Sequence, residues 1–216
     1  QSVEFNAGSY DASKGNFATA GSVNFKIKDR IDHTQINFET GQYQYSRLSG
    51  LVNLKEGDKS NSYAGIEYLQ SSGYFDAPQD LKKLNALLKY NYMISPRLKF
   101  KSSLSYFKSS WSASGQIPER EVRAGRISRF GSIDPTEGGA TARLNWNGQL
   151  DILSSRNQFI KSNSYFTHYD FQLFSNFTYF LIDSIHGDQI EQAEKRNIYG
   201  SELTYDYQQS QFKLQS

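Results

Sequence analysis

The chain has 216 residues, of which 37% are hydrophobic, and a formal net charge of +2; its mean hydropathy is −0.67. It contains 15 Tyr and 15 Phe, so it lacks the composition of a disordered protein, and the small charge excludes the basic footprint of a nucleic-acid-binding protein. The sequence has no cysteine for disulfides or thiolate sites, and no apolar run reaches the roughly 18–20 residues of a transmembrane helix.

The first 30 residues differ from the rest of the chain. Ala7–Tyr10 and Asn16–Gly21 are rich in small residues, which allow close backbone packing, and a short strand is expected over Ser22–Lys28. We therefore expect residues 1–30 to end one unit and residues 31–216 to form another.

From residue 31 onward, apolar and polar residues alternate with a period of two, which predicts strands. The alternation is weak at first and becomes clear in the middle of the chain, where Asn85–Ile94 and the segment that starts at Leu98 flank the tight turn Ser95–Arg97. The earlier, weaker strands are expected over His33–Glu39, Tyr45–Leu54 and Ser62–Gln70.

The clearest pattern is in Thr141–Ile152. Its apolar set is Ala142, Leu144, Trp146, Gly148, Leu150 and Ile152, and its polar set is Thr141, Arg143, Asn145, Asn147, Gln149 and Asp151. A helix would scatter these sets, whereas a strand places them on opposite faces.

Two further strands are expected towards the end of the chain. The first, Asn163–Leu181, is longer than the usual strand of a soluble sheet. Its aromatic and aliphatic set should face lipid, opposite His168 and Asp170. The aromatic and aliphatic set of this strand comprises Tyr165, Tyr169, Phe171, Leu173, Phe177, Tyr179 and Leu181. The eighth strand is expected over Arg196–Tyr207.

The connections alternate in length, with one exception, a short turn near Gly41–Gln42. Short turns on one side and long loops on the other are typical of outer-membrane β-barrels. We therefore predict an all-β fold, an antiparallel transmembrane β-barrel with one face towards lipid and one towards a polar lumen. The short connections are Lys55–Asn61, Ser95–Arg97 and Ser154–Asn157, and the long ones are Ser71–Asp80, Trp111–Gly139 and Ile182–Lys195.

Three stretches resemble TonB-dependent outer-membrane receptors, particularly those of Bacteroidetes. Tyr10–Phe25 looks like the last segment of the plug domain that fills such barrels. The second stretch is similar to an external loop of the family, and the third to a strand–loop–strand. They comprise Trp111–Arg120 with Arg129–Gly139, and Tyr179–Leu181 with Gly187–Ile190 and Ile198–Gly200.

The resemblance implies a barrel of about 22 strands with a plugged lumen, located in the bacterial outer membrane. It implies import of a scarce nutrient, such as a siderophore, cobalamin or a glycan, driven by the TonB–ExbB–ExbD system and in some relatives assisted by a surface lipoprotein. On this reading the chain is a fragment. The TonB box and most of the plug would precede Gln1, and about fourteen strands would follow Ser216.

The long loop Trp111–Gly139 carries the candidate ligand-binding residues. Arginines three residues apart would lie along one side of a short helix and suit an anionic chelate. The alternative is a loop whose balanced charges pair with one another. The candidates are Trp111, Arg120, Arg123, Arg126, Arg129, Asp134 and Glu137.

Other candidate sites are weaker. Trp111, Tyr74, Phe75, Phe130 and Trp146 could form an aromatic platform, or only an interfacial girdle or loop packing. His168, Asp170 and Ser164 lack the other requirements of a catalytic triad. The lumen-facing set Lys89, Lys99, Lys101, Arg143 and Asp151 is expected to solvate the plug. The histidines lack metal-ligand spacing, so we expect no enzyme activity, metal or cofactor.

Two alternatives remain open from the residues alone. Eight strands are enough to close a complete small outer-membrane barrel that acts as an adhesin, structural protein or enzyme. A soluble β-sandwich binding module is the other alternative, although the very long aromatic strand argues against it.

Overall fold

The computed structural model describes the chain except for residues 1, 9–18, 186, 210–211 and 216, and divides it into two compact units. The units are Gln1–Asp32 and His33–Ser216. No helix in the described part of the chain is long and apolar enough to cross a bilayer.

The first unit contains an antiparallel pair, β1 (Ser2–Ala7) and β2 (Gly21–Lys26). β2 confirms the short strand expected over Ser22–Lys28. One face of the pair is apolar because Val3 lies opposite Phe25 and Phe5 opposite Val23. On the other face, Glu4 and Lys26 form an ion pair. Residues 10–18 of the stretch that resembles a plug segment lie outside the described residues, so the plug assignment stays a prediction.

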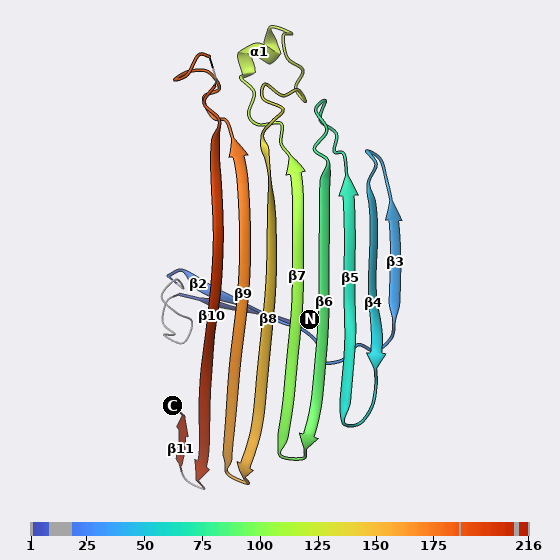
Figure 1. The fold of residues 1–216 in the computed structure, drawn as a ribbon, viewed down its shortest axis with the longest axis vertical. Coiled ribbons are helices and arrows are strands. Elements are labelled where there is room, and N and C mark those ends of the chain that lie inside the picture. Colours follow the sequence, from blue (N-terminus) through green and yellow to red (C-terminus); the bar gives the residue numbers. More distant parts are fainter. Residues whose placement is uncertain (1, 9–18, 186, 210–211, 216) are drawn as a thin grey trace. The chain divides into compact units, whose positions relative to one another are not determined.

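The second unit is a single antiparallel sheet in which every strand pairs with its neighbour in the sequence (Figure 1). This confirms the all-β antiparallel fold and all eight of the expected strands. The strands are β3 (Gln35–Thr40), β4 (Ser46–Lys55), β5 (Ser60–Ser71), β6 (Leu81–Ser95), β7 (Leu98–Ser112), β8 (Gly138–Ser155), β9 (Gln158–Ser175), β10 (Ile190–Gln209) and β11 (Phe212–Gln215).

Long and short connections lie at opposite ends of this sheet. The long loops after β5, β7 and β9 gather at one end, together with the short helix α1 (Glu119–Arg123), and tight turns join the strands at the other end (Figure 1). We call these the loop end and the turn end. The predicted alternation of connection lengths is confirmed, including the short exception between β3 and β4.

Several strand boundaries were predicted wrongly; β10, for example, begins at Ile190 and not at Arg196. The strand expected over Asn163–Leu181 runs from Gln158 to Ser175. It ends there because the Asn176 side chain accepts a hydrogen bond from the Tyr179 backbone amide at 2.8 Å, and Tyr179 has a positive φ of 60°. Such a local side-chain turn competes with the strand ladder, so Phe177, Tyr179 and Leu181 belong to a loop.

The register separates two faces on β6 to β8. Directly opposed residues share a face, so the pairs Leu88–Leu104–Trp146 and Lys89–Ser103–Asn147 lie on opposite sides. We call these the apolar and the polar face. The polar face carries the whole set expected to face the lumen, and the apolar face carries Leu84, Ala86, Leu88, Tyr90, Tyr92, Phe100, Leu104, Tyr106, Leu144, Trp146, Leu150 and Ile152.

The apolar residues form a band that runs diagonally across the sheet. Through successive pairs, Leu48 of β4 is in register with Lys195 of β10, and Val52 is in register with Tyr199. The band begins at Leu48 on β4 but only at Tyr199 on β10, which is four residues further from the loop end. Strands of a barrel tilt relative to its axis, so a diagonal band across the strands corresponds to a horizontal band in a membrane.

The expectation that the aromatic set of β9 faces lipid is wrong. Tyr169 lies opposite Arg143 on the polar face, and His168 lies opposite Leu144 on the apolar face. The reason is the register with β8, which puts the Tyr169 ring 5.0 Å from Arg143 Cζ and 5.9 Å from Arg196 Cζ. These distances allow cation–π contacts. Asp170 is likewise on the apolar face, beyond the band at the loop end.

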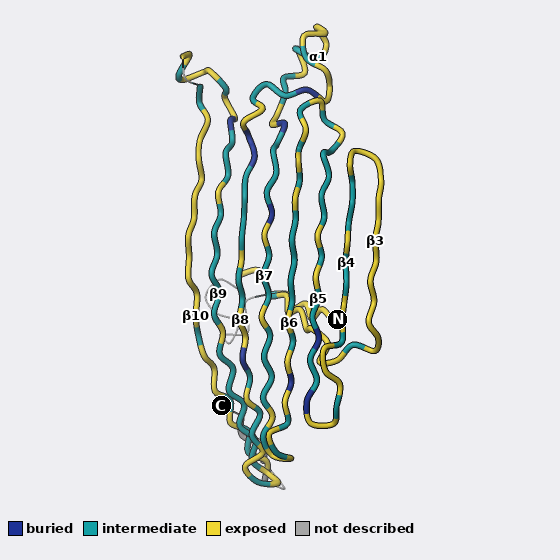
Figure 2. Tube along the Cα trace, turned by 45° about the vertical axis from the view of Figure 1, so that its right-hand side comes forward, coloured by how far each residue is buried: buried dark blue, intermediate teal, exposed yellow. Residues whose placement is uncertain are grey.

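The sheet is open in the part of the chain that the structure describes. Its strand order is linear from β11 to β3, and no pairing joins β3 to β10 or β11 among these residues. In Figure 2, β3 and β10 are exposed along most of their length, in contrast to the strands between them. The first-to-eighth pairing that would close an eight-stranded barrel is therefore not observed.

The register predicts how each position of β8 meets its surroundings in a bilayer. Spin labels at Leu144 and Leu150 of the reconstituted full-length protein should be accessible to oxygen and shielded from a water-soluble nickel reagent, because their side chains lie on the apolar face. Labels at the neighbouring positions Asn145 and Gln149 serve as the matched controls and should show the reverse. If the labels at Asn145 and Gln149 were the ones accessible to oxygen and shielded from nickel, the face assigned to lipid would be the wrong one.

Candidate functional site

The candidate arginines of the long loop mostly pair with acidic residues of the same loop. Arg123 Nη2 lies 2.6 Å from Glu119 Oε1, and Arg126 Nε lies 2.5 Å from Glu121 Oε2. Arg120 Nε is 3.3 Å from the other Glu121 oxygen. Helix α1 has only five residues, so it holds Arg120 and Arg123 but not Arg126 or Arg129.

Arg129 differs from these three arginines. Its side chain is exposed, and none of the ion pairs in the described structure involves it. It precedes Phe130, which belongs to the aromatic cluster described next. Of the loop arginines, Arg129 is therefore the one whose guanidinium is not already committed within the described residues.

Four aromatic side chains from three connections form an aromatic cluster at the loop end. The Tyr74 ring stacks on Phe75 with centroids 4.6 Å apart and meets Phe130 edge-on at 5.5 Å. Tyr43, from the turn after β3, lies 6.3 Å from Tyr74. The structure thus brings together three of the five aromatics proposed from the sequence and adds Tyr43.

The other two aromatics of the proposed platform lie elsewhere. Trp111 is on the polar face of β7, opposite Gly139. A glycine is required at position 139 because a Cβ there would lie 2.6 Å from the backbone oxygen of Gln172 and 3.0 Å from the indole ring of Trp111. Trp146 is on the apolar face, and its indole donates to Ser102 at 3.2 Å. Neither ring contacts the aromatic cluster.

A compact polar cluster ties the loop after β7 to the loop after β9. The Asp134 carboxylate accepts hydrogen bonds from Asn176 at 2.8 Å and from Gln189 at 3.3 Å. Burial raises the pKa of Asp134, but the hydrogen bonds it accepts outweigh this effect and hold its pKa below the ordinary value. Asp134 therefore stays ionised and acts as a bridge between the two loops.

Glu137 sits beside this bridge in a less favourable setting. It is only 8% exposed, and its Oε1 is buried without a hydrogen-bond partner in the described structure. Burial raises its pKa, a backbone hydrogen bond from Asn176 counteracts the rise, and the charge of Asp134 adds to it. The carboxylate packs against Gly115, whose φ of +64° and missing Cβ leave room for it.

The loop after β9 has its own internal anchor. Asp188 accepts backbone hydrogen bonds from Leu181, Ile182 and Asp183 at 2.8–3.2 Å and one from the Thr178 hydroxyl at 2.7 Å. These bonds, chiefly that from Asp183, lower the pKa of Asp188. The carboxylate thus fills a nest of amides, which fixes the loop without any external ligand.

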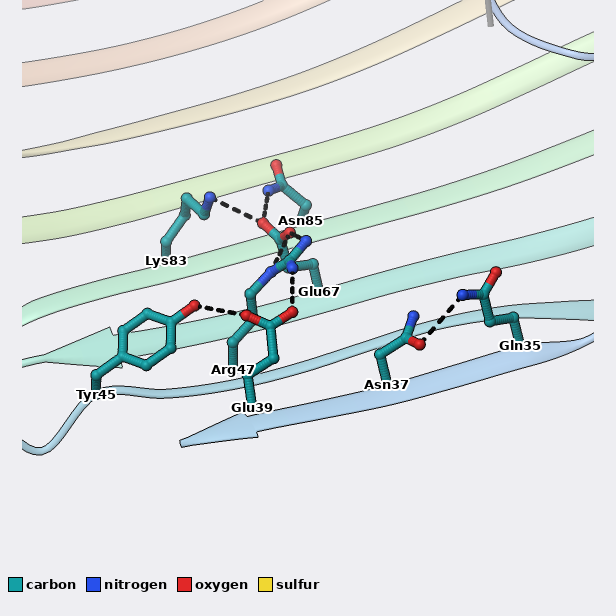
Figure 3. Close-up of polar contacts among 8 residues, drawn as sticks. All are labelled: Gln35, Asn37, Glu39, Tyr45, Arg47, Glu67, Lys83 and Asn85. Atoms are coloured by element: carbon teal, nitrogen blue, oxygen red, sulfur yellow. Dashed lines mark hydrogen bonds and ion pairs between the residues drawn. The ribbon is translucent and has the colours of Figure 1, made fainter. Parts of the chain in front are cut away.

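A charge network crosses four strands on the polar face (Figure 3). Arg47 Nη1 contacts Glu39 at 2.7 Å and its Nη2 contacts Glu67 at 2.6 Å. Glu67 also pairs with Lys83 at 2.8 Å and accepts from Asn85 at 2.9 Å. Two carboxylates thus balance two cations. The sequence alone did not reveal this network, because its members lie on different strands and meet only through the register.

The groups that suggested catalysis or metal binding are already committed. His168 Nε2 lies 2.8 Å from Asp170 and its Nδ1 lies 2.6 Å from Asn197, so neither ring nitrogen is free to act on Ser164. No group of three or more acidic, histidine or cysteine side chains able to hold a metal occurs among the described residues.

Comparisons with known proteins connect this sheet to a class of receptors. No family model and no curated protein matches the chain. Among solved structures, it resembles the siderophore receptor PiuA from Acinetobacter baumannii with a TM-score of 0.73 and 13% identity, over 95% of this chain and 32% of that one. It also resembles the ferric-catecholate import receptor Fiu from E. coli K12 in its open form, with a TM-score of 0.67 and 12% identity, over 95% of this chain and 36% of that one.

At these identities the likeness shows the fold and nothing finer. The chain spans about a third of the length of the two receptors. Its open antiparallel sheet is thus the same kind of structure as one part of such a receptor, whereas the ligand-binding role of the loop residues is not addressed by the comparison.

The charge network predicts a stability effect. Glu67→Gln should lower the free energy of unfolding by about 1–3 kcal/mol, because it leaves two partly buried cations without their shared carboxylate. Adding Lys83→Met should recover part of the loss. Urea unfolding of the full-length protein in detergent micelles measures both, with Glu56→Gln in the turn after β4 as the exposed control. A loss for Glu67→Gln no larger than that of the control would contradict the role given to the network.

Glu137 predicts a dependence on pH with a definite sign. Its raised pKa means that the folded loop prefers the protonated carboxyl, so loop stability should increase as pH falls through that pKa and be lower at neutral pH. Glu137→Gln should therefore protect the loop amides from hydrogen exchange better at pH 7 and remove the gain on acidification. Glu119→Gln on exposed α1 is the matched control. Weaker protection in Glu137→Gln at pH 7 would show that the charged form is favoured.

Proposed function

We propose that the chain is part of a TonB-dependent outer-membrane transporter that imports a ferric siderophore. The observation that carries this proposal is the nine-stranded antiparallel sheet, which matches two iron-chelate receptors over 95% of the chain. The division into a diagonal apolar band and a polar face supports a wall between lipid and a wet lumen.

Several finer parts of the proposal rest on the resemblance seen in the sequence. Residues 1–30 are assigned to the end of a plug and residues 31–216 to the first strands of a barrel of about 22 strands. Coupling to TonB–ExbB–ExbD would pass through parts of the protein outside this chain. The Bacteroidetes type and a surface lipoprotein partner stay predictions of the same kind.

The side chains at the loop end suit an aromatic, anionic ligand. Tyr43, Tyr74 and Phe130 are 45–55% exposed, so their rings are available to stack on the aryl groups of a catecholate chelate. The Arg129 guanidinium adjoins this cluster in sequence and suits an anionic complex. Arg120, Arg123 and Arg126 are assigned to loop structure because they pair with Glu119 and Glu121. Asp134 and Glu137 are assigned to holding the loops.

Uptake of iron tests the proposal. Cells that lack their own catecholate receptors and express the full-length protein should accumulate labelled ferric catecholate, and a protonophore or deletion of tonB should abolish the accumulation. Phe130→Ala and Arg129→Ala should each reduce uptake by about tenfold, since each removes a contact worth about 1–2 kcal/mol.

Two controls make the uptake result interpretable. Arg123→Ala removes a loop arginine that is paired with Glu119 and should leave uptake nearly unchanged. Surface labelling of each variant reports its amount in the membrane. Uptake that persists without tonB, or that never exceeds the level of cells without the protein, would refute the assignment.

A further inference from the structure

We propose that the apolar face carries a binding site for a single phosphorylated lipid, with one acyl chain in a groove across β4 to β8 and the phosphate at Lys108. The inference rests on the membrane placement in the proposed function, but it concerns the opposite side of the wall from any nutrient pathway. It is argued from two adjoining hollows and the charges around them.

The lower hollow is an apolar groove of about 390 Å³. Its floor is low because three small residues, Gly50, Ala64 and Ala86, occupy adjacent strands. Bulkier neighbours stand on both sides of them, and Ile66 and Leu104 are 54% and 42% exposed. A linear hydrocarbon chain fits a shallow apolar groove of this kind, and it is the main component of the surroundings of an apolar barrel band.

The upper hollow, of about 460 Å³, lies nearer the loop end and is polar at its margins. Ala140, Ala142 and Ala193 line it together with Lys108, Lys195 and Asp170. The side chains of these residues are on the apolar face of β7 to β10, beyond the end of the apolar band. A lipid that surrounds the apolar band would have its headgroup at this level, just beyond the edge of the band.

The two hollows meet on β7 and β8. Tyr106 and Leu144 line the groove and oppose each other, and the next pair on the same face, Lys108 and Ala142, lines the upper hollow. Residues two apart on a strand are separated by roughly 6.8 Å, which is within the span of one lipid molecule. The two hollows together are apolar at one end and polar at the other, and the order of these ends along the membrane normal matches that of a lipid molecule.

The charges around the upper hollow favour an anion. Both acidic residues that line the hollow are paired, Asp170 with His168 at 2.8 Å and with Lys195 at 3.7 Å, and Glu194 with Arg196 at 3.0 Å. Lys108 is exposed and forms no ion pair with the described residues, and Lys82 lies on the same face of the neighbouring strand, one pair nearer the loop end. A lysine just beyond an apolar band attracts an anionic headgroup with about 1 kcal/mol, and Lys108 is the cation placed directly above the groove.

Binding of defined lipids to the full-length protein tests the proposal. Native mass spectrometry of the detergent-solubilised protein, titrated with dioleoyl phosphatidic acid, should show one saturable site. Diacylglycerol with the same chains should bind more weakly because it lacks the phosphate, and inorganic phosphate should not compete at equal concentration because it lacks the chains.

Two variants separate the parts of the site. Lys108→Gln should weaken phosphatidic acid binding about fivefold, the equivalent of the attraction given above, and leave diacylglycerol binding unchanged. Ala86→Phe should fill the groove and weaken binding of both lipids. Lys99→Gln is the matched control, because Lys99 lies on the polar face of the same strand, and it should bind phosphatidic acid as the unmodified protein does.

Specific results would overturn the inference. Equal binding of phosphatidic acid to the Lys108→Gln and unmodified proteins would remove the headgroup site, and unchanged binding to Ala86→Phe would remove the acyl groove. Competition by inorganic phosphate would indicate a phosphate site without a lipid. Heat-modifiable gel mobility of the same variants shows that they are folded whether or not the protein imports ferric catecholate, which keeps this outcome separate from failure of the proposed function.

Discussion

The backbone hydrogen-bond ladder is the constraint on which the rest of the second unit depends. Within a bilayer, every amide and carbonyl needs a partner inside the protein, and an antiparallel sheet provides it between neighbouring strands. The ladder also fixes which side chains are opposed, and hence which surface they share. The separation of the apolar face from the polar face follows from strand pairing that extends over successive strands. The side-chain contacts between different strands follow from the same pairing.

The polar surface and the loops use charge in different ways. Along β3 to β6, Glu39, Arg47, Glu67 and Lys83 satisfy one another across the strands, which keeps a charged wall without leaving an isolated ion. In the loops, by contrast, a single carboxylate accepts several hydrogen bonds and so holds the segments around it. Asp188 holds its own loop through backbone amides, whereas Asp134 joins two loops. These connections limit the freedom of long segments that would otherwise be costly to order.

Much of this fold can be predicted from the sequence because its strands and turns depend on residues that are close together in the chain. The period of two, the tight turn at Ser95–Arg97 and the alternating connection lengths each depend on neighbouring residues, and they identified all eight expected strands. The orientation of β9 was not predictable in the same way. Its own alternation is clear, but which of its faces is wet depends on its pairing with β8, where Arg143 meets Tyr169. The end of this strand was missed because Asn176 forms a turn with its side chain.

The candidate site shows the same division between local and distant information. The loop arginines could be found from composition, and their pairing with Glu119 and Glu121 follows from proximity in the chain. The approach of Tyr43 to Tyr74, and of Asn176 to Asp134, joins segments separated by tens of residues. No spacing rule signals such contacts. An exposed aromatic in the short turn after β3 was the only available hint of the first.

The strands lengthen steadily across the sheet, from six residues in β3 to 20 in β10. Most of the added length lies at the turn end, since Thr40 at the end of β3 is in register with Ala193, three residues after β10 begins. The rim nevertheless rises relative to the proposed membrane surface from β3 to β10, because the apolar band recedes from the loop end in that direction. The rim is therefore a ramp. Tyr43, in the turn between β3 and β4, lies at the low side of this rim.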